Sequence, residues 1–264
     1  MSEEELRKLL DFGVELAREA GEITLRYFRK EFETKVKANH TFVTEADLEA
    51  ESFLRRRIND KFPEDAILGE EGGGREGSSG RRWIIDPIDG TYSFVHGVPF
   101  YGVLLGLEVE GEPTLGVINL PALGEVVYAA KGLGCYLNGA RTGVSQTSKL
   151  GDSLVLATDF GTCEQYGFGA AAAELQRRAG ARRTWGDCYG YALVATGRAD
   201  VMFDPVMEVW DCAALLPVLE EAGGTFTDWK GQRTIHSGNA IATNGALFDE
   251  VMGITNPEDT EFKG

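Results

Sequence analysis

Apolar residues recur every three to four positions near the start of the chain, which is typical of an amphipathic helix. Within residues 3–30 these positions are Leu6, Leu9, Leu10, Leu16, Ala17, Ala20 and Ile23. A second helix is predicted from near Thr44, because Thr44 and Asp47 have the spacing of a capping box. Pro63 is expected to close it.

The pattern then changes to short apolar runs separated by turn residues, which predicts strands. Residues 69–80 are rich in glycine and predict a flexible loop. The apolar run at 83–85 is expected to be a strand that stops at Pro87, since proline lacks a backbone N–H group. Residues 101–128 alternate between apolar runs and turns, which predicts an antiparallel meander.

The second half of the chain alternates strand-like and helix-like segments, which favours α/β layering. The expected strands are 153–157, 200–203, 224–227 and 240–243, and the expected helices are 164–178, 187–197, 210–222 and 245–253. We therefore predict two subdomains. Residues 1–146 would hold helices and an antiparallel sheet, and residues 147–264 a smaller mixed sheet with helices.

Composition and charge exclude several classes of function. The chain has 264 residues, 43% of them hydrophobic, and no run of 18 apolar residues, so a membrane span is not expected. The formal charge of −16 would repel a nucleic-acid backbone. The acidic start of the chain is unlike a secretory signal, which predicts a cytoplasmic protein. The four cysteines are widely spaced and are expected to be reduced, buried thiols.

The densest chemical signal is the segment from Asp86 to Thr91, with the sequence Asp-Pro-Ile-Asp-Gly-Thr. Two carboxylates three residues apart at the end of a strand can point toward the same cations. If Gly90 and Thr91 open a helix, the backbone N–H groups there offer a phosphate site. The alternative is a plain turn, since Asp-Pro and Asp-Gly both favour turns.

Three further acids are candidates, and each has a structural alternative. Glu70 follows an apolar run and can complete an oxygen-rich metal site, although an acidic surface loop would also contain it. Asp47 can simply cap its helix. Asp211 lies between Trp210 and a run of small apolar residues, where it can be a metal ligand or an acid at a helix start.

Taken together, these blocks resemble the inositol-monophosphatase superfamily, and the resemblance extends from about residue 5 to 250. The matching blocks are Val43 to Asp47, Gly69 to Glu71, Asp86 to Thr91, Trp210-Asp211 and Glu220 to Gly224. The resemblance implies an αβαβα sandwich of the inositol-monophosphatase/fructose-bisphosphatase type. It also implies a phosphatase that uses two to three Mg²⁺ ions, with Mn²⁺ as a substitute.

The same resemblance implies roles for individual residues. The expected metal ligands are Glu70, Asp86, Asp89, Asp211 and the backbone carbonyl of Ile88. Thr91 and Asp47, together with Glu70, would orient the attacking water, and Gly90 and Thr91 would bind the phosphate. Such chemistry needs charge neutralisation and an in-line water, both of which metal ions supply.

The second half is expected to select the substrate. Gly186 to Tyr191 and Ala195 to Asp200 resemble the histidinol-phosphatase branch. Asp187 and Asp204 would suit a cationic alcohol such as histidinol, although each can also be a helix-start or turn residue. Tyr92 fits neither the inositol-specific nor the histidinol-specific pattern.

We therefore expect a phosphoric monoester hydrolase that acts on a small phosphate ester, with histidinol phosphate as the first choice and histidine biosynthesis as its setting. Alternatives are an inositol monophosphatase, a broad sugar phosphatase or fructose-1,6-bisphosphatase, a bisphosphate nucleotidase, and a catalytically inactive metal-binding module. No nucleic-acid or membrane partner is expected. The resemblance also implies a homodimer.

Overall fold

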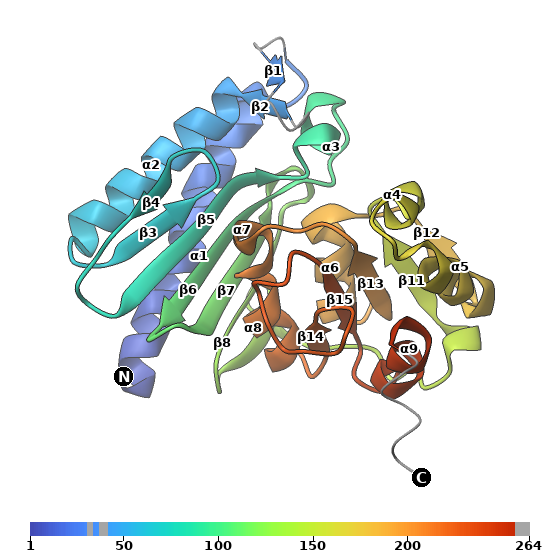
Figure 1. Cartoon of the computed structure of the whole chain (residues 1–264). Coiled ribbons are helices and arrows are strands. Elements are labelled where there is room, and N and C mark those ends of the chain that lie inside the picture. The colour runs from blue at the N-terminus through green and yellow to red at the C-terminus, as the bar shows by residue number, and fades with distance from the viewer. Residues whose placement is uncertain (31–33, 37–41, 257–264) are drawn as a thin grey trace.

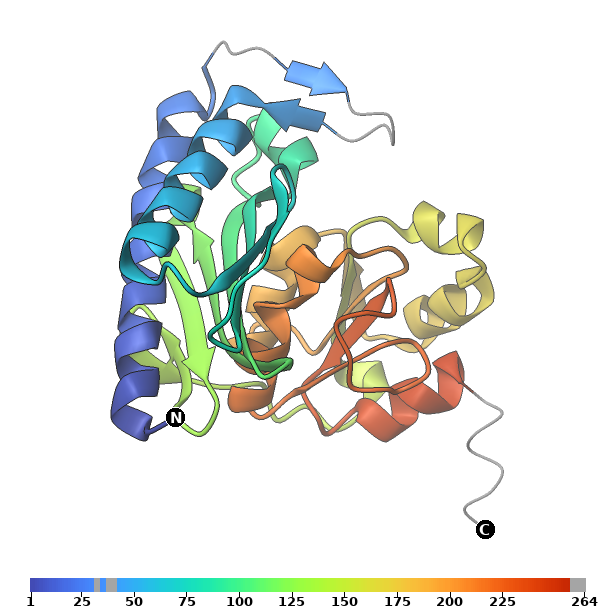
Figure 2. The same ribbon diagram turned by 60° about the vertical axis from the view of Figure 1, so that its left-hand side comes forward.

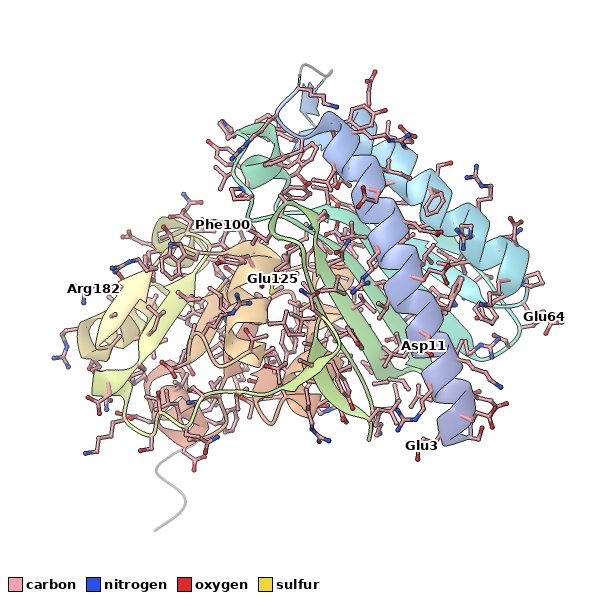
Figure 3. All side chains as sticks on the ribbon, turned by 180° about the vertical axis from the view of Figure 1, so that it is seen from behind. Glu3, Asp11, Glu64, Phe100, Glu125 and Arg182 are labelled. Atoms are coloured by element: carbon pink, nitrogen blue, oxygen red, sulfur yellow. The ribbon has the colours of Figure 1, made fainter. Side chains whose placement is uncertain are left out.

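The first layer of the protein is a pair of long helices that lie side by side on one face of a large sheet (Figures 1 and 3). The structure is a computed structural model and describes residues 1–30, 34–36 and 42–256. Helix α1 spans Glu3–Tyr27 and helix α2 spans Glu45–Lys61. The predicted capping box of α2 is present, because Thr44 accepts from the helix and Asp47 accepts from the Thr44 backbone.

The large sheet has eight strands in the order β10-β9-β8-β7-β6-β5-β3-β4. All neighbours in it are antiparallel except β3 and β5. Its strands are β3 (Ala66–Gly69), β4 (Gly73–Arg75), β5 (Arg81–Asp89), β6 (Gly102–Val109), β7 (Glu112–Leu120), β8 (Glu125–Ala130), β9 (Gly134–Leu137) and β10 (Ala140–Thr142). The predicted meander is formed by β6, β7 and β8. A separate two-stranded sheet pairs β1 (Thr34–Val36) with β2 (Phe42–Thr44).

The second sheet has five strands in the order β12-β11-β13-β15-β14 and mixes parallel and antiparallel pairs. Its strands are β11 (Leu154–Ala157), β12 (Ala181–Arg183), β13 (Val201–Asp204), β14 (Thr225–Thr227) and β15 (Ala240–Thr243). The other helices are α3 (Thr91–Val95), α4 (Phe160–Gln165), α5 (Gly169–Arg178), α6 (Asp187–Ala195), α7 (Val209–Cys212), α8 (Leu215–Glu221) and α9 (Phe248–Thr255), with 3₁₀ turns at Pro121–Leu123 and Leu150–Asp152.

Two further helical layers complete the sandwich (Figure 2). One apolar cluster joins Ile118 of the large sheet, Val194 of α6, Leu216 of α8 and Met202 of the second sheet, so α6 and α8 lie between the sheets. Another joins the outer face of the second sheet to α5 and α9. The layers are therefore α1/α2, large sheet, α6/α8, second sheet and α5/α9, which is the predicted αβαβα arrangement.

The central apolar cluster draws residues from both halves of the chain. The large sheet ends at Thr142 and the second sheet begins at Leu154, and the predicted boundary near residue 147 falls between them. Division into subdomains 1–146 and 147–264 stays a prediction. Among the described residues, no helix is long and apolar enough to cross a membrane. All four cysteines are free and buried, as expected.

The prediction that the strand stops at Pro87 was wrong. β5 continues to Asp89, and its register with β6 shifts between Asp86 and Asp89. On its other side β5 pairs with β3 only as far as Ile85. Pro87 lies beyond this pairing, so no hydrogen bond to β3 requires an N–H group at this position. Proline is tolerated at such a bulge because the regular ladder is already interrupted there.

Three other local predictions need correction. The loop at 69–80 contains β4, which pairs with β3. The helix expected over 164–178 is divided into α4 and α5 at Gly167, which has a φ of 84° and ends α4 as a left-handed residue. The helix expected over 210–222 is divided after Cys212. Pro217 has no N–H to donate to residue 213, so α8 begins just before it.

Candidate active site

The bulge of β5 brings two carboxylates into one cavity. The Ile88 N–H group donates to Asp86 Oδ1 at 3.0 Å, and the Thr91 hydroxyl donates to the Ile88 carbonyl at 3.0 Å. Gly90 follows with a φ of 78°, and a Cβ there would lie 2.9 Å from the Phe100 carbonyl oxygen. Both the positive φ and the close carbonyl oxygen therefore require glycine at this position. The turn holds Asp86 and Asp89 so that both line the same cavity.

Asp211 reaches the same place from the second half of the chain. It lies in the first turn of α7, where its Oδ2 accepts from the Glu208 N–H group at 2.7 Å. Asp86, Asp89 and Asp211 each offer a carboxylate oxygen, and these oxygens all lie within 4.8 Å of one another. This spacing is suited to a hard divalent cation held by oxygen ligands.

Glu70 lines the cavity that contains the three aspartates, and this cavity has a volume of about 570 Å³. The Glu70 N–H group donates to the Ile85 carbonyl, which holds the end of β3 against β5. The cavity is lined by Phe42, Glu70, Asp86, Ile88, Asp89, Gly90, Thr91, Tyr92, Asp187, Val206, Met207, Glu208, Trp210 and Asp211. None of these lining residues is Lys or Arg, so they cannot neutralise the acids by themselves.

Asp47 is fully buried and is not among the residues that line this cavity. Its Oδ2 accepts from the Thr44 N–H group at 2.8 Å, whereas its Oδ1 has no hydrogen-bond partner in the part of the chain that the structure describes. Burial first, and then the charges of Glu71 and Glu70, raise the pKa of Asp47 to about 7. A buried carboxylate oxygen without a partner is costly, which indicates that a water or cation belongs beside it.

The electrostatics of the cluster also fit a bound cation. Burial raises the pKa of Asp86 well above its usual value, and the charges of Glu70, Asp89 and Asp211 raise it further. Burial likewise raises the pKa of Asp89 and of Asp211. Several carboxylates held together out of water repel one another, and a divalent cation would remove that cost. The residues present therefore fit a metal site.

The two acids predicted to select the substrate lie next to this cluster. Asp187 lines the main cavity and also a smaller adjoining cavity of about 120 Å³, which Asp204 lines as well. Asp204 is 5% exposed, and it accepts from the Tyr191 hydroxyl at 3.1 Å and from the Thr158 N–H group at 3.1 Å. Asp187 and Asp204 are thus brought together, although Asp204 does not line the main cavity.

The backbone of Asp187 is unusual, because this non-glycine residue has a φ of 52°. The Asp187 N–H group donates to the Thr158 hydroxyl at 2.8 Å, which helps to hold the conformation. Burial and then the charges of Asp89 and Asp204 raise the pKa of Asp187 well above its usual value. Strained backbone of this kind is concentrated at functional sites.

Sequence reasoning passed over two residues that contact the site. Glu51 accepts from the Glu71 and Gly72 N–H groups, beside Glu70, and Thr158 contacts both Asp187 and Asp204. No motif marks either residue. The only signal for Glu51 was its place one helical turn after Asp47 on α2.

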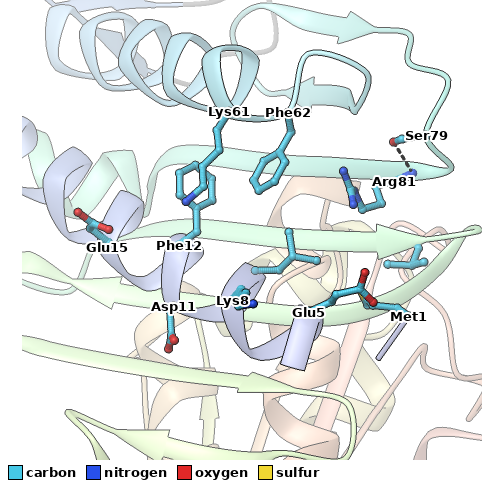
Figure 4. A pocket seen from close by; sticks show the side chains of 12 residues that line it. Met1, Glu5, Lys8, Asp11, Phe12, Glu15, Lys61, Phe62, Ser79 and Arg81 are labelled. Carbon is cyan, nitrogen blue, oxygen red and sulfur yellow. Dashed lines mark hydrogen bonds between the residues drawn. The ribbon is translucent and has the colours of Figure 1, made fainter. Parts of the chain in front are cut away.

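A separate cavity of about 670 Å³ lies between α1, the end of α2 and β5 (Figure 4). It contains no predicted site residue. Its cations are already in contact with other groups, since Lys61 lies 4.3 Å from the Phe12 ring centroid and Arg81 pairs with Asp65. The carboxylate cluster therefore remains the candidate active site.

The five-layered α/β fold and a partly buried cluster of three carboxylates that can hold a metal ion define the class of protein. The chain belongs to the inositol monophosphatase family, whose model matches residues 5–257. It is accordingly a phosphoric monoester hydrolase.

Individual relatives agree with this assignment. The chain is 46% identical to a histidinol-phosphatase of Chlorobaculum parvum, over 90% of this chain and 93% of the relative. It is 35% identical to a fructose-1,6-bisphosphatase/inositol-1-monophosphatase of Thermotoga maritima, over 97% of this chain and 98% of the relative. Among solved structures, a Thermotoga maritima inositol monophosphatase superposes with a TM-score of 0.86 at 33% identity, covering 96% of this chain and 99% of that one.

Proposed function

We propose that this protein hydrolyses histidinol phosphate to histidinol and phosphate in a reaction that depends on Mg²⁺, with Mn²⁺ as a substitute. The observation that supports it best is the position of Asp187, which lines both the metal-site cavity and the smaller cavity with Asp204. A leaving group that extends from one cavity toward the other would meet two carboxylates. Relatives named histidinol-phosphatase, including the one at 46% identity, support the same substrate.

The metal would be held by Glu70, Asp86, Asp89 and Asp211, with the Ile88 carbonyl as a further oxygen ligand. When bound, two to three Mg²⁺ ions would lower the pKa of a water molecule and neutralise charge on the departing oxygen. The fixed bulge at residues 86–89 keeps the ligand oxygens in place before the ion arrives. The site is therefore preorganised, and little reorganisation is needed during the reaction.

Thr91 and Asp47, together with Glu70, would orient the attacking water. The Thr91 hydroxyl hydrogen is directed to the Ile88 carbonyl at 3.0 Å, so its oxygen can accept a hydrogen bond from that water. Asp47 Oδ1 is a second acceptor, since no described group pairs with it. Two acceptors and a neighbouring carboxylate fix the orientation of the water for in-line attack.

The phosphate would be bound by the backbone N–H groups of Gly90 and Thr91 at the start of α3, beside the metal ligands. The leaving group would then lie toward Asp187 and Asp204. The amine of histidinol is positively charged at neutral pH, so two carboxylates favour it over a polyol, which has no charge to offset their desolvation.

The main alternative is an inositol monophosphatase or a broader sugar phosphatase. It is favoured by the Thermotoga maritima relative, whose name includes both fructose-1,6-bisphosphatase and inositol-1-monophosphatase. That alternative keeps the metal site and phosphate site and changes only the role of Asp187 and Asp204.

The test is phosphate release with Mg²⁺ from histidinol phosphate, inositol-1-phosphate, fructose-1,6-bisphosphate and 3′-phosphoadenosine-5′-phosphate. We expect the highest kcat/KM for histidinol phosphate. In Asp187→Asn, which keeps the shape of the side chain, that value should fall at least tenfold while the value for inositol-1-phosphate stays within about threefold. A clear preference of the unaltered protein for inositol-1-phosphate would show that histidinol phosphate is not its main substrate.

The expected homodimer rests on the family resemblance, and the expected cytoplasmic location rests on the sequence. A homodimer and a cytoplasmic location, with a role in histidine biosynthesis, therefore stay predictions. Analytical ultracentrifugation of the purified protein would measure its oligomeric state directly.

A further inference from the structure

Tyr92 is an exposed aromatic residue in the active-site cavity that the roles above leave unused. Tyr92 is 68% exposed although it lines the cavity. It directly follows Thr91 on α3, so it lies next to the proposed water and phosphate contacts. Exposed apolar surface beside a binding site indicates that a ligand covers it.

The ring of Tyr92 is held in place by two neighbours. The His96 ring stacks on it with centroids 4.4 Å apart and an interplanar angle of 26°. Phe42 of β2 lies beside it, 5.8 Å away and tilted by 39°, and also lines the cavity. Phe42, Tyr92 and His96 thus form an aromatic cluster at the cavity wall.

A hydrogen bond fixes the His96 ring in this cluster. His96 Nδ1 lies 2.8 Å from the Tyr92 carbonyl oxygen, and because a carbonyl can only accept, Nδ1 carries the proton. His96 therefore covers one face of the Tyr92 ring and Phe42 lies beside it, yet Tyr92 stays 68% exposed and can still contact a ligand. The geometry is that of a stacking platform that is already rigid before a ligand binds.

The cavity that holds this platform also contains acids from the second half of the chain. Asp187 and Glu208 line it together with Tyr92, and no Lys or Arg is among the described residues that line it. An aromatic face combined with carboxylates selects a flat group that bears positive charge, since stacking and cation–π attraction act on the same ring. A ring of hydroxyl groups without a π-system would gain neither contribution.

We propose that Tyr92 is a specificity-determining residue that stacks against a planar, protonatable ring of the leaving group. This inference rests on the proposed function, in which that ring is the imidazole of histidinol phosphate. Imidazole titrates near neutral pH, so its protonated form is available to both the aromatic face and the acids. The Phe42 ring beside Tyr92 extends the apolar surface at the same wall.

The experiment compares Tyr92→Leu, which removes the ring, with Tyr92→Phe, which keeps it. KM and kcat are measured with saturating Mg²⁺ for histidinol phosphate and for inositol-1-phosphate. In Tyr92→Leu the KM for histidinol phosphate should rise roughly 3- to 10-fold, while the KM for inositol-1-phosphate changes less than about twofold. Tyr92→Phe should match the unaltered protein with both substrates.

Equal KM changes for the two substrates, or none for either, would overturn the inference, because a residue that only supports the fold or the metal site affects both esters alike. The two proposals fail in different ways. If the unaltered protein prefers histidinol phosphate and Tyr92→Leu keeps that preference, only the role of Tyr92 is wrong. If the unaltered protein hydrolyses only esters without such a ring, histidinol phosphate and the role of Tyr92 are both wrong.

Discussion

The backbone N–H group of Cys188 donates a 2.6 Å hydrogen bond to Oδ2 of Asp89. This bond joins the start of α6, where Asp187 lies, to one of the three clustered carboxylates. It also lowers the cost of burying Asp89, since it favours the charged form of that carboxylate. Asp187 of the proposed leaving-group site is therefore linked to Asp89 of the proposed metal site through the backbone of its neighbour Cys188.

A first prediction concerns the backbone of Asp187. Its φ of 52° is tolerated by Asn and disfavoured for Ala, while burial and like charges oppose the ionised side chain. Without metal, both Asp187→Asn and Asp187→Ala remove this charge, and Asp187→Asn should raise the melting temperature. Because of the positive φ, the free energy of unfolding of Asp187→Ala should be about 1–2 kcal/mol lower than that of Asp187→Asn. Thermal unfolding in EDTA measures both. Equal melting temperatures for the two variants would contradict this account of the strain.

A second prediction concerns the pH dependence of stability without metal. Burial raises the pKa of Asp204 to about 7 from the ordinary value of 3.8. Between these values the folded state binds more protons than the unfolded state, so stability falls as the pH rises toward 7. The slope contributed by Asp204 is at most about 1.4 kcal/mol per pH unit, and Asp204→Asn should remove it.

Denaturant unfolding in EDTA at several pH values between 5 and 8 would measure this slope. Asp159→Asn is the matched control, because hydrogen bonds from Thr162 and Gly161 lower the pKa of Asp159. Asp159 is then ionised in both states throughout this range and should leave the slope unchanged. An Asp204→Asn protein with the original slope would show that Asp204 does not titrate as described.

A third prediction separates metal binding from folding. Asp86→Asn keeps an oxygen to accept the Ile88 N–H group and removes one charge from a buried group of acids. The metal-free variant should melt at a higher temperature than the unaltered protein. Its turnover should fall at least a hundredfold, because one proposed metal ligand is lost.

The gain in stability on adding Mg²⁺ would measure the metal affinity directly. A ligand at a hundred times its Kd adds about 2.7 kcal/mol to the free energy of unfolding, and Asp86→Asn should lose most of that gain. Asp204→Asn is the control and should keep it, since Asp204 does not line the main cavity. Near-normal turnover in Asp86→Asn would refute the metal assignment.

The parts of the site that the sequence predicted are those formed by neighbouring residues. The capping box of Thr44 and Asp47 and the turn at Gly90 depend on contacts within four positions, and both were read correctly from residue type and spacing. The clustering of Asp211 with Asp86 depends on how two sheets pack. Only the family resemblance, and no local pattern, joined those two residues.

The parts that the sequence did not predict depend on distant contacts. Glu51 meets Glu71 and Gly72 after a separation of about twenty residues, and Thr158 meets Asp187 and Asp204 across larger ones. A buried glutamate on an amphipathic helix has the same spacing as an exposed one, so periodicity alone does not distinguish them. The continuation of β5 past Pro87 was missed for a similar reason, since it depends on where β3 ends.

The final prediction tests whether Glu51 positions Glu70, one of the proposed metal ligands. Glu51 is 2% exposed, and its two carboxylate oxygens accept from the Glu71 and Gly72 N–H groups, each at 2.7 Å. Glu51→Gln replaces one of these oxygens with an NH₂ group, which cannot accept. One of the two N–H groups then loses its partner, and the segment that follows Glu70 is held by fewer hydrogen bonds.

Arg55 Nε also donates to Glu51 Oε1 at 2.6 Å, so Glu51→Gln weakens this ion pair as well. We expect the variant to lower the free energy of unfolding by about 1–3 kcal/mol, through the lost acceptor and the weakened ion pair together. The Mg²⁺ concentration for half-maximal activity should rise several-fold, because Glu70 is no longer held in place. Glu49→Gln on the same helix is the control, since Glu49 pairs with Arg26 at the surface. Unfolding and Mg²⁺ titrations test the two effects separately. A Glu51→Gln protein that loses stability but keeps the original Mg²⁺ dependence would show that Glu51 supports only the fold.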